Sequence, residues 1–273
     1  MAKGPTTIGD VTMGRRNTFG PGVVISGPAV IGDDNFFGAY AVIGGRCRQA
    51  HQQGAAARRK TGTVGMVGMV GTVGIGSGNY FGEHSVMHAP VGRATVLGDN
   101  SSVGAGSLLA HDSCVGSHVT LSVNCTVGGH SVMLDWSGLG IGSSLHPRTV
   151  MGHWSFAGMA AVVTRTVGIG HLVVGNPAEF LRLNFEAFVR SGLDSAALAQ
   201  LREFLDGGNP PPGSNPVSRA VAEFEAATSR TVRNRVLRSW SDIEPARSRD
   251  ASREVPRDVS HEASREASRD SHD

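Results

Sequence analysis

Residues 91–133 read VGRATVLGDNSSVGAGSLLAHDSCVGSHVTLSVNCTVGGHSVM, and every sixth residue of this stretch, counted from Val91, is apolar. The same step continues to Ile169, and the residue after each apolar one is usually glycine. An α-helix does not tolerate so many glycines, and a strand in a flat sheet would alternate with a period of two. The apolar positions are Val91, Leu97, Val103, Leu109, Val115, Leu121, Val127, Met133, Leu139, Leu145, Met151, Ala157, Val163 and Ile169.

A short, fixed period with one apolar residue per repeat is typical of a parallel β-solenoid, where each unit buries its side chain by stacking on its neighbours. We therefore predict an all-β solenoid of hexapeptide repeats. Three hexapeptides form one triangular coil, so residues about 18 positions apart are expected to lie above one another, about 4.8 Å apart.

The same period sets the limits of the solenoid. Residues 46–62 contain no inward apolar series and are rich in arginine, which predicts a basic loop that projects from a corner of the triangular coil. The period ends at Gly175-Asn176-Pro177, so we assign residues 1–176 to the solenoid. Its N-terminal repeats are expected at Phe19, Ile25, Ile31, Phe37 and Ile43.

Helical spacing replaces the six-residue period after Pro177. Apolar residues of the 184–190 segment share one face, Asp194 is expected to cap a second helix, and a third helix is expected from about Val217. We therefore predict a small C-terminal helical domain at 177–240. The segment 241–273 alternates charges and offers little apolar surface, which predicts a disordered tail.

The composition excludes several functional classes. The formal net charge of the 273 residues is only +2, which does not indicate a nucleic-acid partner. The three cysteines form no Cys-x-x-Cys pair, which fits a reducing compartment and does not indicate structural zinc. The N-terminus lacks the long apolar run of a signal peptide, and no apolar run reaches the roughly 18 residues of a membrane span. We expect a cytoplasmic protein without a membrane span.

Three histidines are spaced close to the length of a coil. His130 and His146 follow His111 by 19 and 35 residues, so all three are expected near one line along the solenoid. Such a column could bind zinc through converging ligands, or one imidazole could act as a general base while the others position a substrate. Asp112 offers His111 a carboxylate, although adjacent residues of a strand point to opposite sides unless a corner intervenes.

These residues resemble a known family, the UDP-N-acetylglucosamine O-acyltransferase that opens lipid A synthesis. The resemblance covers roughly residues 5–208 and implies a left-handed parallel β-helix, assembled as a homotrimer with active sites between subunits. It implies acyl carrier protein, through its phosphopantetheine thioester, as the acyl donor and a UDP-sugar as the acceptor, with no other cofactor and no metal. The similar segments are Ala110-His111-Asp112, Gly128-Gly129-His130, Leu145-His146, Gly175-Asn176-Pro177 and residues 184–192.

The resemblance also implies roles for single residues. His111 would remove the proton from a sugar hydroxyl, Asp112 would support His111, and the backbone N–H of Gly129 would hold the oxyanion. The residues implied to contact the sugar nucleotide or the pantetheine arm are His130, His146, Asn184, Glu186 and Arg190.

Four positions concern the choice of substrate. Met159 stands where this family measures the acyl chain and where glycine leaves room for a long one, so methionine predicts a shorter acyl group; the alternative for Met159 is ordinary packing. Ala50 and Gln52 stand where the family has an Asp and a Lys for the sugar nucleotide. Pro147 replaces a Gln and cannot donate a hydrogen bond. A different nucleotide sugar is therefore an open alternative.

Three other functions stay open at this point. An acetyl-coenzyme A-dependent acetyltransferase acting on a sugar or amine shares the hexapeptide repeats. A zinc hydratase of the γ-carbonic anhydrase type shares the solenoid, but its close histidine pair is not present among His111, His130 and His146. The third is a non-catalytic trimeric scaffold.

Overall fold

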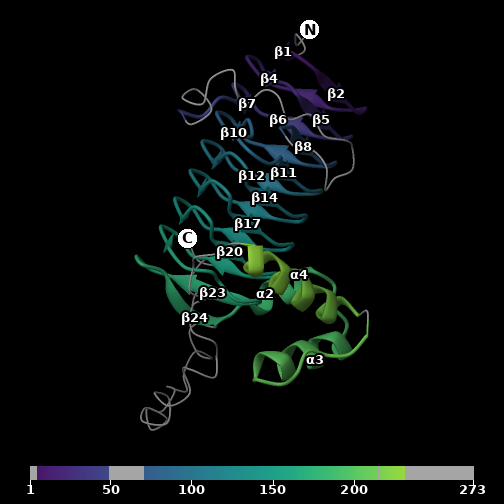
Figure 1. Ribbon diagram of the computed structural model, residues 1–273, viewed down its shortest axis with the longest axis vertical. Coiled ribbons are helices and arrows are strands. Elements are labelled where there is room, and N and C mark those ends of the chain that lie inside the picture. Colours follow the sequence, from purple (N-terminus) through teal and green to yellow (C-terminus); the bar gives the residue numbers. More distant parts are fainter. Residues whose placement is uncertain (1–4, 49–70, 214, 231–273) are drawn as a thin grey trace, which may run out of the picture. The chain divides into compact units, whose positions relative to one another are not determined.

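The computed structural model describes residues 5–48, 71–213 and 215–230. Within these ranges the chain winds as a parallel β-helix, and its short strands stack as ladders along three faces (Figure 1). No helix in the same ranges is both long and apolar enough to cross a membrane.

Each face is one sheet, and neighbouring strands within a sheet are about one coil apart in the chain. The first sheet holds β1 (Thr6–Ile8), β4 (Val24–Ser26), β7 (Val42–Gly45), β10 (Val86–His88), β13 (Leu108–Leu109), β16 (Thr126–Val127), β19 (Ser144–Leu145) and β22 (Val162–Val163). The second holds β2 (Val11–Met13), β5 (Ala29–Ile31), β8 (Val73–Ile75), β11 (Thr95–Leu97), β14 (Cys114–Val115), β17 (Val132–Met133) and β20 (Val150–Met151). The third holds β3 (Thr18–Phe19), β6 (Phe36–Phe37), β9 (Tyr80–Phe81), β12 (Ser102–Val103), β15 (Thr120–Leu121), β18 (Gly138–Leu139), β21 (Phe156–Ala157), β23 (His171–Val174) and β24 (Glu179–Leu183), of which β23 and β24 pair antiparallel.

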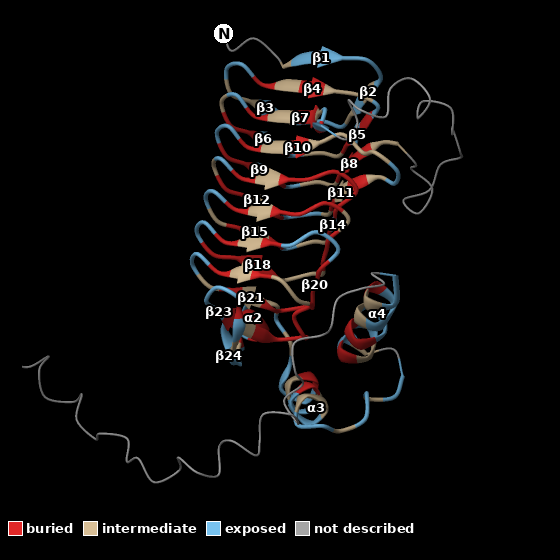
Figure 2. Ribbon diagram, turned by 60° about the vertical axis from the view of Figure 1, so that its left-hand side comes forward, coloured by how far each residue is buried: buried red, intermediate tan, exposed pale blue. Residues whose placement is uncertain are grey.

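The register of the sheets explains the six-residue period. Leu121 pairs with Leu139 in the parallel ladder, so residues 18 positions apart are neighbours in successive coils. Both residues are buried in the core of the prism, like the other apolar positions of the regular coils. Buried segments recur along the stacked coils (Figure 2). Glycine follows because successive coils approach closely there: a Cβ on Gly104 would lie 2.5 Å from the carbonyl carbon of Ser122. The predicted parallel β-helix of hexapeptide repeats is confirmed.

A long insertion leaves the coil between β7 and β8. β8 stacks on β5, with Ile75 beside Ile31, although the two residues are much further apart in the chain than one coil. Most of the loop predicted at 46–62 lies outside the described residues, so this loop stays a prediction. Ala50 and Gln52 lie outside the described residues.

A shorter insertion separates β10 from β11. Met87 and Leu97 are consecutive inward residues, both buried, and ten positions rather than six separate them. Val91 was predicted to point inward, but it lies half-buried in a bend of this insertion and outside the core, so that prediction is wrong. The physical reason is that the inserted backbone turns outward and donates hydrogen bonds to a carboxylate one coil away, at Asp112.

The last coil is shorter than the regular ones. Val173 pairs with Ala157, only 16 positions away, and both Val167 and Val173 are buried in the prism. Ile169, which was predicted to be an inward residue of the solenoid, is instead buried among helices. The helices supply an apolar surface at this end of the prism, so the chain no longer needs to bury every sixth residue inside it.

The C-terminal segment forms α2 (Phe185–Arg190), α3 (Ser195–Leu205) and α4 (Pro216–Arg230), close to the predicted positions. The Asp194 carboxylate caps α3, accepting a 2.8 Å hydrogen bond from the N–H of Ala197. The helices pack on the last coils through a common core that contains Trp154, Ile169, Phe188, Leu201 and Val217. The boundaries predicted for the helical domain (177–240) and the tail (241–273) extend past the described residues and stay predictions.

Candidate active site

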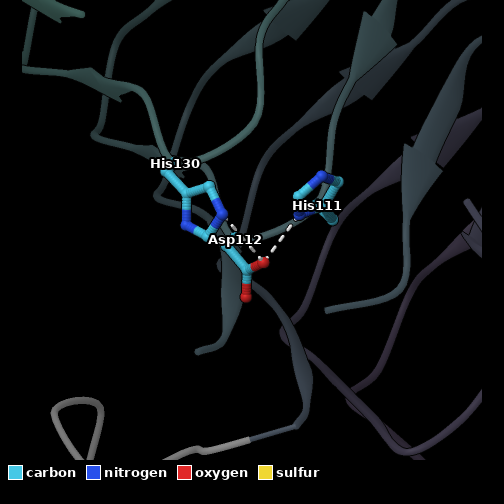
Figure 3. Close-up of side chains that lie close together, drawn as sticks. All are labelled: His111, Asp112 and His130. Carbon is cyan, nitrogen blue, oxygen red and sulfur yellow. Dashed lines mark hydrogen bonds and ion pairs between the residues drawn. The ribbon is translucent and has the colours of Figure 1, made fainter. Parts of the chain in front are cut away.

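His111 and Asp112 form the turn after β13, and His130 lies in the turn after β16, one coil further along. Asp112 and His130 have φ angles of 60° and 61°, so the chain changes direction at both residues. The corner that sequence reasoning left open is therefore present, and the adjacent side chains of His111 and Asp112 converge. Figure 3 shows the two imidazoles on either side of the Asp112 carboxylate.

The Asp112 carboxylate is completely buried and joins the two histidines. Its Oδ2 lies 2.6 Å from Nδ1 of His111 and 3.7 Å from Nε2 of His130. The imidazole rings of His111 and His130 meet edge to face, with centroids 5.1 Å apart. The carboxylate therefore orients His111 through a hydrogen bond and lies close to the His130 ring.

The second oxygen of Asp112 is held by the insertion between β10 and β11. Oδ1 accepts backbone hydrogen bonds from Gly92 at 2.8 Å and Arg93 at 2.6 Å. Burial acts to raise the Asp112 pKa, but the hydrogen bond with His111 and the two backbone N–H groups outweigh it and lower the pKa. The group is thus a carboxylate at neutral pH.

The ionised carboxylate determines the tautomer of His111. A carboxylate only accepts hydrogen bonds, so Nδ1 of His111 carries the proton and Nε2 has a free lone pair. The His111 side chain is 11% exposed, so Nε2 can still meet a ligand. This arrangement can remove a proton from a bound hydroxyl.

Gly129 lies beside the free nitrogen of His111. The ladder pairs Leu109 with Val127, which brings Gly129 level with His111 in the next coil. None of the described residues accepts a hydrogen bond from the Gly129 N–H. A backbone donor therefore lies next to the atom that can act as a base.

Sequence reasoning missed three residues of this cluster. Arg93 donates from Nε to the carbonyl oxygen of Asp112 at 2.9 Å and from Nη2 to that of His130 at 3.0 Å. The Thr95 hydroxyl accepts a 2.9 Å hydrogen bond from the Asp112 N–H. The buried Nδ1 of His88 has no hydrogen-bond partner among the described residues, and burial, together with nearby His111, lowers the His88 pKa. The only signal for them was the slip in the period after Met87.

His146 does not join the cluster in one chain. Its side chain is exposed, and its Nδ1 lies 2.9 Å from the carbonyl oxygen of Pro147. The ladder places His146 level with Gly128, one position away from the line through His111 and Gly129. The His column is therefore only partly continuous.

The other predicted site residues also lie away from His111 within one chain. Asn184 is buried, and its amide donates a 2.9 Å hydrogen bond to the carbonyl oxygen of Trp154. Glu186 is exposed on α2, 3.9 Å from Arg182, and Arg190 is exposed at the end of the same helix. Met159 follows β21 of the third sheet, whereas His111 follows β13 of the first, so they belong to different edges of the prism.

The side chains of His111, Asp112 and His130 also fulfil one requirement of a metal site. Each offers a ligand atom, and these atoms lie within 4.8 Å of one another. Two of these side chains already share a 2.6 Å hydrogen bond, and the remaining Asp112 oxygen is taken by backbone donors. The observed contacts thus match a hydrogen-bonded base more closely than an open set of metal ligands.

Comparison with known proteins agrees with this architecture. Residues 10–45 match the model of the bacterial transferase hexapeptide family (six repeats). No curated protein matches the chain. Similar solved structures include the UDP-N-acetylglucosamine acyltransferase of Francisella novicida, with 19% identity over 93% of both chains and a TM-score of 0.68. The Arabidopsis enzyme of the same name has 18% identity over 88% of this chain and 95% of its own, with a TM-score of 0.53.

A third similar structure is LpxA from Acinetobacter baumannii, with 23% identity over 81% of this chain and 86% of its own and a TM-score of 0.54. At these identities the likeness concerns the fold, and at that level it confirms the resemblance noted in the sequence. The chain contains bacterial transferase hexapeptide repeats and has the fold of the UDP-N-acetylglucosamine acyltransferases.

Proposed function

We propose that the protein is an acyltransferase that moves an acyl group from acyl carrier protein to a hydroxyl of a UDP-N-acetylhexosamine. The observation that carries the proposal is the hydrogen bond of 2.6 Å between His111 Nδ1 and Asp112, which leaves Nε2 free beside the Gly129 N–H. A base and an oxyanion donor at neighbouring positions are what acyl transfer from a thioester to an alcohol requires.

The reaction is assigned to these groups as follows. Nε2 of His111 takes the proton of the sugar hydroxyl, and the oxygen of that hydroxyl attacks the carbonyl carbon of the thioester. The Gly129 N–H donates to the oxyanion of the tetrahedral intermediate, and the charge of Asp112 stabilises the imidazolium. The C–S bond then breaks, and the pantetheine sulfur takes the proton from His111. The products are an acyl ester of the sugar and a free thiol.

The remaining substrate contacts are assigned to His130, His146, Asn184, Glu186 and Arg190. Because the α2 residues lie away from His111 in one chain, this assignment requires a second copy of the chain and fits the expected homotrimer. Arg190 suits a phosphate or a polar uridine atom. An acyl carrier protein donor also fits the expected cytoplasmic location.

The acyl chain is assigned to an apolar row on another edge of the prism. Val123, Ile141 and Met159 occupy equivalent positions in successive coils, and their exposed fractions are 40%, 49% and 70%. Exposure on this scale argues against the alternative that Met159 merely fills a gap in the core. In a trimer this row would be supplied by a neighbouring copy, and Met159 would limit the length of the acyl group.

The decisive experiment measures thiol release from acyl carrier protein thioesters by the purified full chain, with and without UDP-N-acetylglucosamine. We expect release only when the sugar nucleotide is present, its loss in His111→Ala, and its retention in His118→Ala, a change at an exposed histidine on another edge. Wild-type turnover in His111→Ala would remove the assigned base. Turnover with acetyl-coenzyme A as donor, and none with acyl carrier protein thioesters, would favour the acetyltransferase alternative.

The zinc hydratase alternative rests on the three ligand atoms at His111, Asp112 and His130. Metal analysis of the purified chain distinguishes it: about one zinc per chain that is lost in His130→Ala, together with carbon dioxide hydration, would replace the acyltransferase proposal. Absence of turnover with every donor and acceptor would leave the trimeric scaffold.

A further inference from the structure

A second cluster of polar side chains lies where the last coils meet α4. Asp135 and His153 occupy equivalent turn positions in successive coils, after β17 and β20, because Met133 pairs with Met151. Glu223 faces them from the middle of α4. The three side chains belong to three separate segments, and none takes part in the site around His111.

The ligand atoms of this cluster are close enough to share one ion. One atom from each of Asp135, His153 and Glu223 lies within 4.8 Å of the other two, and Nε2 of His153 is 3.1 Å from a Glu223 oxygen. Oδ1 of Asp135 is held by a 2.8 Å hydrogen bond from the Ser117 N–H. No hydrogen bond among the described residues uses Oδ2 of Asp135, so that oxygen is available as a ligand.

An independent observation is the state of His153. Its side chain is only 5% exposed, and its Nε2 makes no hydrogen bond of good geometry with the described residues, although a Glu223 oxygen lies 3.1 Å away as an ion-pair partner. A buried polar atom without a partner is costly, and an imidazole nitrogen is the commonest protein ligand for transition metals. A metal ion held between His153 and the two carboxylates would remove that cost.

The cluster also opens onto a cavity that can supply the rest of a coordination shell. The cavity has a volume of about 420 Å³ and is lined by all three side chains and by Trp154 and Arg219. Water molecules in this space could fill the coordination positions that the protein leaves open.

We propose that Asp135, His153 and Glu223 bind one divalent transition-metal ion through an imidazole nitrogen and two carboxylate oxygens, and that this ion fastens α4 to the last coils. Nitrogen and oxygen ligands of this kind suit Zn²⁺ and its first-row neighbours. The site is separate from the proposed acyl transfer, and its role is to stabilise the contact between the helices and the β-helix.

The test uses the full-length chain without a histidine tag, stripped with EDTA and titrated with Zn²⁺ by calorimetry, followed by elemental analysis of the dialysed protein. We expect about one ion per chain at this site, and a loss of affinity of more than about 100-fold in His153→Gln, because even an indirect partner of a metal ligand is worth 10–100-fold. Zn²⁺ should raise the Tm of the wild type by several degrees and leave that of His153→Gln unchanged.

Three matched variants make the result specific. Glu223→Gln changes a half-exposed side chain, so its loss of Zn²⁺ binding could not be attributed to misfolding. His84→Gln alters an exposed histidine that does not line this cavity and should bind Zn²⁺ like the wild type. Zn²⁺ binding that survives in both His153→Gln and Glu223→Gln, or that is lost only in His111→Gln, would overturn the proposal, as would a wild type that binds none.

Discussion

A Cβ atom added at Gly129 would lie 2.9 Å from Nε2 of His111, closer than non-bonded atoms of this kind approach. The two residues occupy the same position in successive coils, so the backbone of one coil forms the floor beneath the imidazole of the other. The absence of a side chain at residue 129 therefore lets the His111 imidazole approach the backbone of the next coil.

This relationship predicts the effect of Gly129→Ala. The methyl group should displace the His111 ring, and a misplacement of about 1 Å is expected to lower kcat about 100-fold. Stability should fall by about 1–3 kcal/mol, because the displaced ring weakens the hydrogen bond with the buried Asp112 carboxylate. Steady-state kinetics and thermal unfolding check this, and an alanine variant with normal kcat would show that the imidazole does not act from this position.

Asp112→Asn should reduce kcat by about 100-fold to 10,000-fold, because an amide can donate to Nδ1 of His111 and favour the wrong tautomer. The amide oxygen of asparagine is also a weaker acceptor than the carboxylate for the N–H groups of Gly92 and Arg93. We therefore expect a loss of about 1–3 kcal/mol in the free energy of unfolding.

The matched control for this change is Asp99→Asn. Oδ1 of Asp99 accepts a 2.7 Å hydrogen bond from the Ser77 N–H in another turn, and no described histidine side chain bonds this carboxylate. It should affect stability without the loss of kcat. Equal kinetic losses in both variants would indicate a general effect on the coils.

Arg93→Met should lower kcat by about tenfold, because the side chain holds the carbonyl oxygens of Asp112 and His130 and acts only through them. Methionine keeps the apolar part of the side chain, so the free energy of unfolding should fall by only about 1–2 kcal/mol relative to the wild type. Arg202→Met, on the exposed surface of α3, is the control for loss of an arginine charge. A kcat unchanged by Arg93→Met would show that the backbone N–H groups suffice to hold the turn.

His171 predicts a pH dependence of stability. It is buried, and burial lowers its pKa to about 4, so the unfolded chain binds its proton more readily than the folded one. The contribution of neutral His171 to the free energy of unfolding is therefore fully present above about pH 6.5 and is lost as the pH falls from 6.5 towards 4. The loss amounts to about 3 kcal/mol, at about 1.4 kcal/mol per pKa unit. Below pH 4 this contribution no longer changes.

The measurement is urea unfolding at a series of pH values. His171→Gln should remove about 3 kcal/mol of the change between pH 6.5 and 4, whereas His118→Gln, at an exposed position, should not. Burial also lowers the pKa of His88 and His130, so part of the slope persists in every single variant. An undiminished slope in His171→Gln would contradict the assignment.

Met159→Gly should shift the preferred acyl group of the proposed transferase towards longer chains. The methionine side chain is 70% exposed, so its removal leaves no cavity in the core and should not destabilise the fold. A series of acyl carrier protein thioesters of increasing length gives the ratio of kcat/KM values. Val30→Ala, at an apolar residue that is 44% exposed and lies outside this row, should leave the preferred length unchanged. An identical profile for Met159→Gly would remove its role in selecting chain length.

The coil, its three faces and the inward residues from Leu97 to Val163 could be predicted from the sequence, because one buried residue every six positions and the glycine after it are local requirements of each coil. The helices could be predicted for the same reason, since caps such as Asp194 act within a few residues. The pairing of His111 with Asp112 and Gly129 follows from the 18-residue register once a corner is placed there.

The contacts that depend on irregular segments needed the tertiary structure. The insertion containing Val91 and Arg93 has no period, so its hydrogen bonds to Asp112 could not be counted from the sequence. Glu223 meets Asp135 and His153 because α4 packs back on the last coils, although Glu223 follows His153 by 70 residues and Asp135 by 88. A repeat specifies its own neighbours, whereas the approach of a distant segment is set by how the buried surfaces fit together.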